Sequence, residues 1–320
     1  MTTDVENDTR RLGRDVLGPH AFEKQMPHWQ KRLIVDQRGF LNTIQYGSEP
    51  KMSILMMKNE SYNTIPVLQA LSSVDPNVTS FGYCHPATNH FHKRASLSGF
   101  CGYHSISSLL SYLRGCSTAP KHHRYATHLP NILEIQDIIE EGWRAGINSK
   151  ALLQTGGIRG TRKYIGTSEA ETCLKTLNVH CYVMCIQSNK EKMACDQVME
   201  RLERYFMREP AIGENMLGKP PVYFQYSGHS TVVVGFETWK ERKLVVPGVV
   251  QMASEHLTEL VVFDSARPAT EEVRKVRDEA MPFEKLKAFL PVMAGYRVSR
   301  YELQKYDRFE LVFLEDPKLF

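Results

Sequence analysis

The stretch GFCGYHSISSLLSYLRG, residues 99–115, decides the fold. Its apolar residues recur three and four positions apart, which predicts a helix with one apolar face. These residues are Ile106, Leu109, Leu110 and Leu113. Gly115 can end this helix, and Cys101 stands at its start, with Gly99 and Gly102 giving the backbone room to turn. A helix N-terminus stabilises a thiolate, so we expect a reactive thiol at Cys101. The alternative is a buried cysteine that packs as a small apolar side chain.

The second half of the chain is rich in short runs of β-branched and aromatic residues, which predict strands. These runs cover residues 179–186, 221–226, 231–236, 257–263 and 309–314. Apolar periodicity predicts helices before most of them, at 65–71 and 132–145. Helices followed by strands indicate an α+β fold in which the helix that carries Cys101 packs against an antiparallel sheet.

Two polar residues lie at the ends of predicted strands. His229 precedes the run 231–236, and Asp264 follows the run 257–263. If these two strands pair antiparallel, the start of the first lies beside the end of the second. His229 would then be a base and Asp264 the acid that orients it. The order Cys, His, Asp, with the cysteine on a helix and the others on strands, is that of papain-like cysteine peptidases. Asp264 could otherwise be an acidic turn residue.

The other histidines lack this pattern. His85, His90 and His92 occur with Cys84 in CHPATNHFH, which could bind a metal, although the spacing matches no common zinc pattern. The remaining ones have no carboxylate at a strand end and are expected at the surface or in packing. They include His104, His122, His123, His128 and His180. We therefore expect neither a metal nor a cofactor.

Composition excludes several classes of protein. The 320 residues are 42% hydrophobic and 24% charged, as in ordinary soluble globular proteins. A net charge of +4 from 40 basic and 36 acidic side chains gives no sign of direct nucleic-acid binding. There is no apolar run of about 18 residues and no apolar N-terminal segment, so we expect neither a membrane span nor a secretory signal. Seven cysteines without C-x-x-C spacing suit free thiols in the cytoplasm, the nucleus or both.

The chain divides into three regions. Residues 1–15 are polar and expected to be flexible. Residues 16–72 are expected to form a helical arm with apolar side chains. These are Phe22, Met26, Trp29 and Leu33. Residues 73–320 would form the papain-like peptidase domain, with an excursion at KLVVPGVV, residues 243–250.

Five separated stretches resemble the UfSP/ZUFSP-type cysteine peptidase family, and more closely its ZUFSP-like deubiquitinase branch with its fungal members. They are GFCGY at 99–103, IQDIIEEGWRAGIN at 135–148, GGIRGTRKYIGTSEA at 156–170, FQYSGHS at 224–230 and LVVFDSA at 260–266. In addition, GPHAFEKQMPHW at 18–29 is similar to the segment before the peptidase in fungal relatives. The resemblance covers most of the chain. The N-terminal region has no paired Cys/His zinc-finger modules, unlike the longer animal relatives.

The resemblance implies a role for four residues. Cys101 would be the nucleophile, His229 the base and Asp264 the third member. Gln225, four residues before the histidine, would donate to the oxyanion, although it could also be a strand residue facing solvent. The implied substrate is ubiquitin or polyubiquitin, with a preference for chains linked through ubiquitin's lysine sixty-three. The arm would grip the distal ubiquitin.

The sequence departs from the family in two respects. The UfSP and autophagy-protease branches use an Asp-Pro-His motif that does not occur here, which argues against the ubiquitin-fold modifier as substrate. His104 and Ser105 stand where the family's Cys-Gly-Tyr-Arg-Asn has Arg and Asn. Three alternatives stay open: a peptidase for another ubiquitin-like modifier, a catalytically weak ubiquitin-binding module, and a metalloprotein that uses the cluster from Cys84 to His92.

Overall fold

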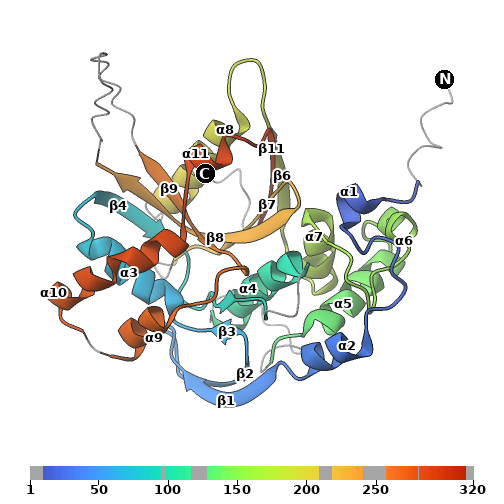
Figure 1. Cartoon of the computed structure of the whole chain (residues 1–320), viewed down its shortest axis with the longest axis horizontal. Helices are drawn as coiled ribbons and strands as arrows, with labels where there is room; N and C mark the ends of the chain where they lie inside the picture. Colours follow the sequence, from blue (N-terminus) through green and yellow to red (C-terminus); the bar gives the residue numbers. More distant parts are fainter. Residues whose placement is uncertain are drawn as a thin grey trace.

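An antiparallel sheet organises the chain in the computed structural model, which describes residues 10–94, 99–116, 128–208, 218–240, 257–279 and 281–314 (Figure 1). Its strand order is β10-β9-β8-β7-β11-β6, with β4 also paired to β8. The strands are β4 (Val78–Tyr83), β6 (Tyr182–Gln187), β7 (Val222–Tyr226), β8 (His229–Trp239), β9 (Thr258–Phe263), β10 (Arg297–Ser299) and β11 (Arg308–Phe313). Five of these are the predicted strands. The expected excursion at 243–250 lies outside the described residues.

Helix α4 (Cys101–Gly115) forms the centre of the core, because every residue from Gly102 to Gly115 is buried. It packs against β7 and β8 and against α5 (Ile132–Arg144) and α7 (Thr167–Thr176). Helix α8 (Ala194–Met207) packs against β4, β6, β8 and β11, and it lies on the other side of the sheet from α4 in Figure 1. Nearly all of β8 is therefore buried. The predicted α+β class, with a cysteine-bearing helix against an antiparallel sheet, is confirmed.

The predicted helical arm is only partly helical. It contains α1 (Arg14–Leu17), α2 (His28–Val35) and α3 (Thr64–Val74), but also the antiparallel pair β1 (Arg38–Ile44) and β2 (Met52–Met57). The turn-rich residues between these strands, including Gly47 with a φ of 55°, let the chain reverse. Met26 and Ile34 belong to the same buried cluster as Leu109 of α4. This part of the arm thus packs on the body.

Residues 10–15 are held in place, contrary to the expectation for 1–15. The backbone N–H of Leu12 donates to the carbonyl of Gln154 at 2.8 Å, and α1 begins at Arg14. The hydrogen bond and the packing of Leu17 fix this segment beside α6 (Lys150–Thr155). Residues 1–9 lie outside the described residues.

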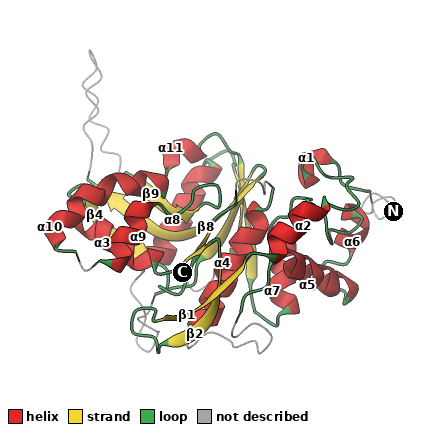
Figure 2. Cartoon of the chain, turned by 60° about the horizontal axis from the view of Figure 1, so that its bottom comes forward, coloured by secondary structure: helices red, strands yellow, loops and turns green. Residues whose placement is uncertain are grey.

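The remaining elements are short or peripheral. They are β3 (Glu60–Ser61), β5 (His90–Phe91), α9 (Glu271–Asp278), α10 (Phe283–Leu286), the 3₁₀ helix η3 (Lys287–Gly295) and α11 (Arg300–Leu303). Figure 2 shows α3, α9 and α10 together at one end of the molecule, and α1, α2, α5 and α6 at the other. Across the described ranges, no helix is both long and apolar enough to cross a membrane.

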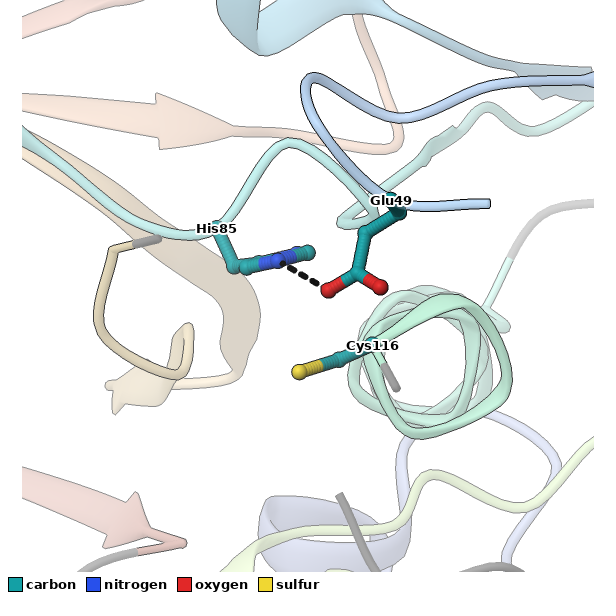
Figure 3. Close-up of side chains that lie close together, drawn as sticks. All are labelled: Glu49, His85 and Cys116. Carbon is teal, nitrogen blue, oxygen red and sulfur yellow. Dashed lines mark hydrogen bonds and ion pairs between the residues drawn. The ribbon is translucent and has the colours of Figure 1, made fainter. Parts of the chain in front are cut away.

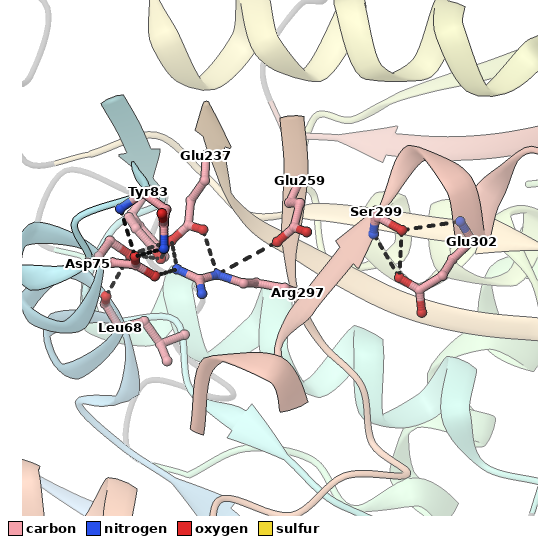
Figure 4. Close-up of polar contacts among 10 residues, drawn as sticks. Leu68, Asp75, Tyr83, Glu237, Glu259, Arg297, Ser299 and Glu302 are labelled. Atoms are coloured by element: carbon pink, nitrogen blue, oxygen red, sulfur yellow. Dashed lines mark hydrogen bonds and ion pairs between the residues drawn. The ribbon is translucent and has the colours of Figure 1, made fainter. Parts of the chain in front are cut away.

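A buried charged cluster joins the end of α3 to the sheet (Figure 4). The guanidinium of Arg297 on β10 donates to Glu237 of β8 at 2.7 Å and to Asp75, just after α3, at 3.0 Å. Ser72 and Tyr83 also hydrogen bond to Glu237. The cluster holds α3 against the body, although the expected domain boundary fell between residues 72 and 73.

Candidate active site

Cys101 is the first residue of α4 and is half-buried. Gly99 has a φ of 88°, which favours glycine, and lets the chain turn into the helix. A Cβ on Gly102 would lie 2.7 Å from Cγ1 of Ile165 and 3.1 Å from the hydroxyl of Tyr223. Glycine at 102 therefore lets the start of the helix lie directly against β7 and the loop that holds Ile165.

The hairpin of β7 and β8 positions His229. Tyr226 pairs with His229 across a two-residue turn, in which Gly228 has a φ of 73°. Strands β8 and β9 pair antiparallel, with Val232 opposite Phe263. As predicted, the start of β8 lies beside the end of β9. The Nε2 of His229 lies 3.1 Å from Oδ1 of Asp264.

The charges at these three residues reinforce one another. Burial raises the pKa of the Cys101 thiol, but hydrogen bonds with His229 and with the backbone N–H of Ser230 outweigh it and lower the pKa overall. The hydrogen bond to Asp264 is the main cause that raises the pKa of His229 to about 9. Burial raises the pKa of Asp264, yet the bonds from His229 and the N–H of Ala266 lower it overall. This arrangement favours a thiolate beside an imidazolium.

A cleft of about 270 Å³ runs beside Cys101. One wall comes from the N-terminal segment, the second from the residues before and within the start of α7, and the third from the sheet. The lining residues include Leu12, Val16, Leu17, Tyr164, Ile165, Gly166, Gln225, Ser230 and Glu310. Gln225 therefore lies in the same cleft as Cys101. A Cβ on Gly166 would come within 2.8 Å of Oε1 of Gln225, so glycine at 166 lets this segment pack directly against the Gln225 side chain.

The loop of residues 156–166 lines the cleft through Tyr164, Ile165 and Gly166, which the sequence did not predict. Gly156, Gly157 and Gly160 have φ values between 66° and 81°. The carboxylate of Glu140 on α5 accepts the backbone N–H groups of Ile158 and Arg159, both at 2.8 Å. The three glycines in GGIRG were the available signal of a specially shaped loop. Leu12 and Val16 were missed because their segment was expected to be flexible or part of a separate arm.

The residues of CHPATNHFH do not converge on one point. Cys84 donates to the carbonyl of His85, whereas His90 contacts Asp264. The side chain of His85 instead turns to Glu49 and Cys116, and the ligand atoms of these three buried residues lie within 4.8 Å of one another (Figure 3).

The hydrogen bonds of His85 oppose metal binding by Glu49, His85 and Cys116. Nδ1 of His85 accepts the backbone N–H of Ala87 at 3.1 Å, so Nε2 carries the proton and donates to Glu49 at 3.2 Å. A histidine that binds a metal through Nε2 needs its proton on Nδ1, where this structure has another donor.

The other histidines are distributed as packing or surface residues. His104 and Ser105 are both buried in α4, and burial lowers the pKa of His104 to about 3. His180 is exposed, and His128 is partly buried. His122 and His123 lie outside the described residues.

A cysteine at a helix start, facing a histidine that is held by a carboxylate at the end of the neighbouring strand, is the arrangement of cysteine peptidases. A model of Peptidase family C78 matches residues 77–312, and the chain belongs to this family. This match confirms the resemblance inferred from the five sequence stretches.

Curated relatives in the comparison are ubiquitin peptidases by name. The chain is 27% identical to Zinc finger-containing ubiquitin peptidase 1 of Bos taurus over 220 residues, which cover 67% of this chain and 35% of the relative. The same protein of Rattus norvegicus is 26% identical over 253 residues, 75% of this chain and 40% of the relative. Ubiquitin carboxyl-terminal hydrolase mug105 of Schizosaccharomyces pombe (strain 972 / ATCC 24843) is 23% identical over 137 residues, 42% of this chain and 54% of the relative.

The chain thus matches about two fifths or less of the length of the zinc finger-containing relatives. Among solved structures, it is similar to the crystal structure of UfSP from C. elegans. That match has a TM-score of 0.46 and 14% identity, and covers 77% of this chain and 36% of the other.

Proposed function

We propose that this chain is a thiol-dependent deubiquitinase that hydrolyses isopeptide bonds of ubiquitin conjugates. The observation that carries the proposal is the contact of His229 with both Asp264 and Cys101 beside a cleft. Membership of a peptidase family and relatives named as ubiquitin peptidases support the substrate class.

The reaction is an acyl transfer in two steps. The Cys101 thiolate attacks the carbonyl carbon of ubiquitin's C-terminal glycine, and the imidazolium of His229 gives its proton to the departing lysine amine as the C–N bond breaks. Water then attacks the thioester, His229 takes a proton from it, and the thiolate leaves. Asp264 keeps the His229 ring in position throughout.

Two donors would stabilise the oxyanion of each tetrahedral intermediate. They are the backbone N–H of Cys101, at the unpaired start of α4, and the side-chain amide of Gln225. Loss of one such donor typically lowers kcat by about two to three orders of magnitude. Gln225→Ala is therefore expected to lower kcat in that range.

An electrophilic probe built on the ubiquitin C-terminus tests the function directly. We expect the wild type to form a covalent adduct and both Cys101→Ala and Cys101→Ser to form none. Cys185→Ala is the matched control, because Cys185 is an exposed thiol outside the site and its loss should not affect labelling. Labelling of the Cys101 variants would refute the proposal. Reaction only with probes built on other modifiers would assign the site to another ubiquitin-like protein, and binding without labelling would indicate a catalytically weak module.

The exposed side of the arm is our proposed docking surface for distal ubiquitin. Phe22 and Trp29 are 59% and 52% exposed, while Met26 is buried and Leu33 partly buried against the core. Val16, at the start of the arm, lines the cleft. A large surface beyond the cleft would hold the tail in register for attack.

Point variants test this surface better than a deletion, because Met26 and Ile34 are part of the core. Phe22→Ala with Trp29→Ala should raise KM about tenfold for a ubiquitin substrate and leave cleavage of a short peptide with the same C-terminal sequence unchanged. Phe283→Ala, an exposed aromatic residue on α10, is the control. Equal effects on both substrates would exclude a docking role.

Linkage preference and location complete the proposal. Family resemblance supports a preference for lysine-sixty-three chains, and cleavage of a panel of diubiquitins tests it. Seven free cysteines fit the reducing cytoplasm or nucleus, which fluorescence microscopy of the tagged chain can check.

A further inference from the structure

His90 lies between the helix that carries Cys101 and the segment that carries Asp264. It lies on β5, and its side chain is fully buried. Its ring stacks on Phe263, with centroids 4.7 Å apart and planes 15° apart. Its Nε2 lies 3.0 Å from the backbone carbonyl of Asp264. A carbonyl can only accept, so Nε2 carries the proton and donates.

Neighbouring bonds make the segment around His90 a rigid support. The N–H of Asn89 donates to Ser111 of α4 at 2.8 Å, and the N–H of Lys93 donates to the carbonyl of Ser265 at 2.7 Å. The segment is thus tied on one side to the helix that carries Cys101 and on the other to the residues that carry Asp264.

Asp264 needs such a support because the strand ladder ends before it. The last pair between β8 and β9 is Val232 with Phe263, so no ladder partner fixes the main chain at Asp264. The direction of its carboxylate toward His229 depends on that main chain. In place of a ladder bond, the carbonyl of Asp264 accepts the backbone N–H of Arg267 at 2.9 Å, within its own turn, and Nε2 of His90 at 3.0 Å. The N–H of Ala266 donates to Oδ1 of Asp264 at 2.8 Å, so His90 is the contact that ties the Asp264 carbonyl to a separate segment.

We propose that His90 is a positioning residue, which holds the main chain at Asp264 and thereby aims the carboxylate at His229. This inference rests on the proposed function of the same site. Burial lowers the pKa of His90 to about 4, against an opposing bond to Asp264, so the ring is neutral at neutral pH and keeps one donor. The titratable neighbours that affect it are His92 and Asp264, and His104 faces it from α4.

Two substitutions separate the hydrogen bond from the packing. His90→Phe keeps an aromatic ring over Phe263 but has no donor. His90→Gln places an amide N–H near the position of Nε2. We expect His90→Phe to lower kcat about tenfold with KM unchanged, as fits the loss of one buried hydrogen bond, and His90→Gln to recover most of it. An unchanged kcat in His90→Phe would overturn the proposal.

A double-mutant cycle with Asp264→Ala tests whether the effect passes through Asp264. Once the carboxylate is absent, His90→Phe should cause no further loss of kcat. If the two losses multiply instead, His90 has only a structural role and the proposal fails. Should His90→Phe not fold, His90→Asn replaces it, because its shorter amide does not reach the carbonyl.

The alkylation rate of Cys101 by iodoacetamide across pH gives a readout that needs no substrate. His90→Phe and Asp264→Ala should both move the alkylation profile to higher pH, since each weakens the imidazolium that stabilises the thiolate. Identical profiles in wild type and His90→Phe would overturn the inference. Failure of ubiquitin hydrolysis alone would refute the proposed function but leave this result standing.

Discussion

At the scale of single residues, opposite pKa shifts distinguish Cys101 and His229 from buried residues of the same type. Burial raises the pKa of Cys84 to about 12 because it outweighs the hydrogen bond with Thr88, and it lowers the pKa of His104 to about 3 because the neighbouring histidines add to its effect. In Cys101 and His229 the partners outweigh burial. Burial alone would favour neutral side chains at both residues, so the contact of Cys101 with His229, and of His229 with Asp264, favours the charged pair.

These shifts predict the pH dependence of kcat/KM. Activity should rise with pH as Cys101 loses its proton, at a lower pH than for an ordinary thiol, and fall as His229 loses its proton near pH 9. Asp264→Asn removes the largest cause of the raised pKa of His229 and should move the falling limb to lower pH, with some activity retained. Kinetics with a fluorogenic ubiquitin substrate from about pH 5 to 10 measure both limbs. A falling limb that stays in place in Asp264→Asn would contradict this account.

The sequence could predict that His229 and Asp264 lie beside each other, because each stands at the end of a recognisable strand. It could not predict the contact of His90 with Asp264. That contact joins a side chain to a main-chain carbonyl 174 positions away. Every residue has such a carbonyl, so residue type does not indicate which one accepts the hydrogen bond. For the same reason, the sequence could not predict the hydrogen bond from the N–H of Leu12 to the carbonyl of Gln154.

At the scale of elements, the predicted strands were found because each is a run of β-branched and aromatic residues, including the edge strand β6, which is mostly exposed. The pair β1 and β2 was missed because β1 is mostly exposed and shows no regular alternation. The cleft wall at 156–166 has no regular element that a periodic pattern could indicate. Its shape depends on the carboxylate of Glu140 from a separate helix.

Two acidic residues of α5 allow a matched test of this wall. Glu140 is buried and accepts two backbone N–H groups of the loop, whereas Asp137 pairs at the surface with the side chain of Arg159. Glu140→Ala leaves those donors unpaired and should lower the free energy of unfolding by about 2 to 3 kcal/mol. It should also raise KM, because Tyr164 and Ile165 line the cleft.

Asp137→Ala is the control for the same helix and loop. Its exposed ion pair is worth about 0 to 1 kcal/mol, so stability and KM should stay close to the wild type. Urea unfolding and steady-state kinetics measure the two quantities. Equal losses in both variants would mean that Glu140 does not shape the loop.

At the scale of the whole molecule, the arm and the peptidase body share one core. The turn-rich stretch after residue 72 predicted a boundary, but Ser72, in the last turn of α3, donates to Glu237 across it. Asp75, directly after α3, and Glu237 both pair with Arg297, which is 222 and 60 positions away from them. Turn signals are local in sequence, whereas these ion pairs join distant segments. We therefore expect arm and body to unfold together.

Arg297→Met tests this coupling. It leaves the carboxylate of Glu237, which is 0% exposed, and that of Asp75, which is 6% exposed, without their guanidinium partner. Removal of one partner from a buried ionic cluster costs about 3 to 5 kcal/mol, since the remaining charge has lost its compensation. Arg38→Met is the control, because the pair of Arg38 with Glu134 is 50% and 32% exposed and should contribute about 1 kcal/mol or less.

Neutral side chains in place of Glu237 and Asp75 should restore part of the stability that Arg297→Met loses. In Arg297→Met with Glu237→Gln and Asp75→Asn, no uncompensated buried charge remains, so part of the stability should return. Unfolding by guanidinium chloride, followed by circular dichroism and by tryptophan fluorescence, should give coincident single transitions for each variant. Trp29 reports on the arm, and Trp143 and Trp239 report on the body. A separate early transition of fluorescence would show that the arm is an independent unit. An Arg297→Met protein as stable as the Arg38→Met control would show that the charged cluster does not join α3 to the sheet.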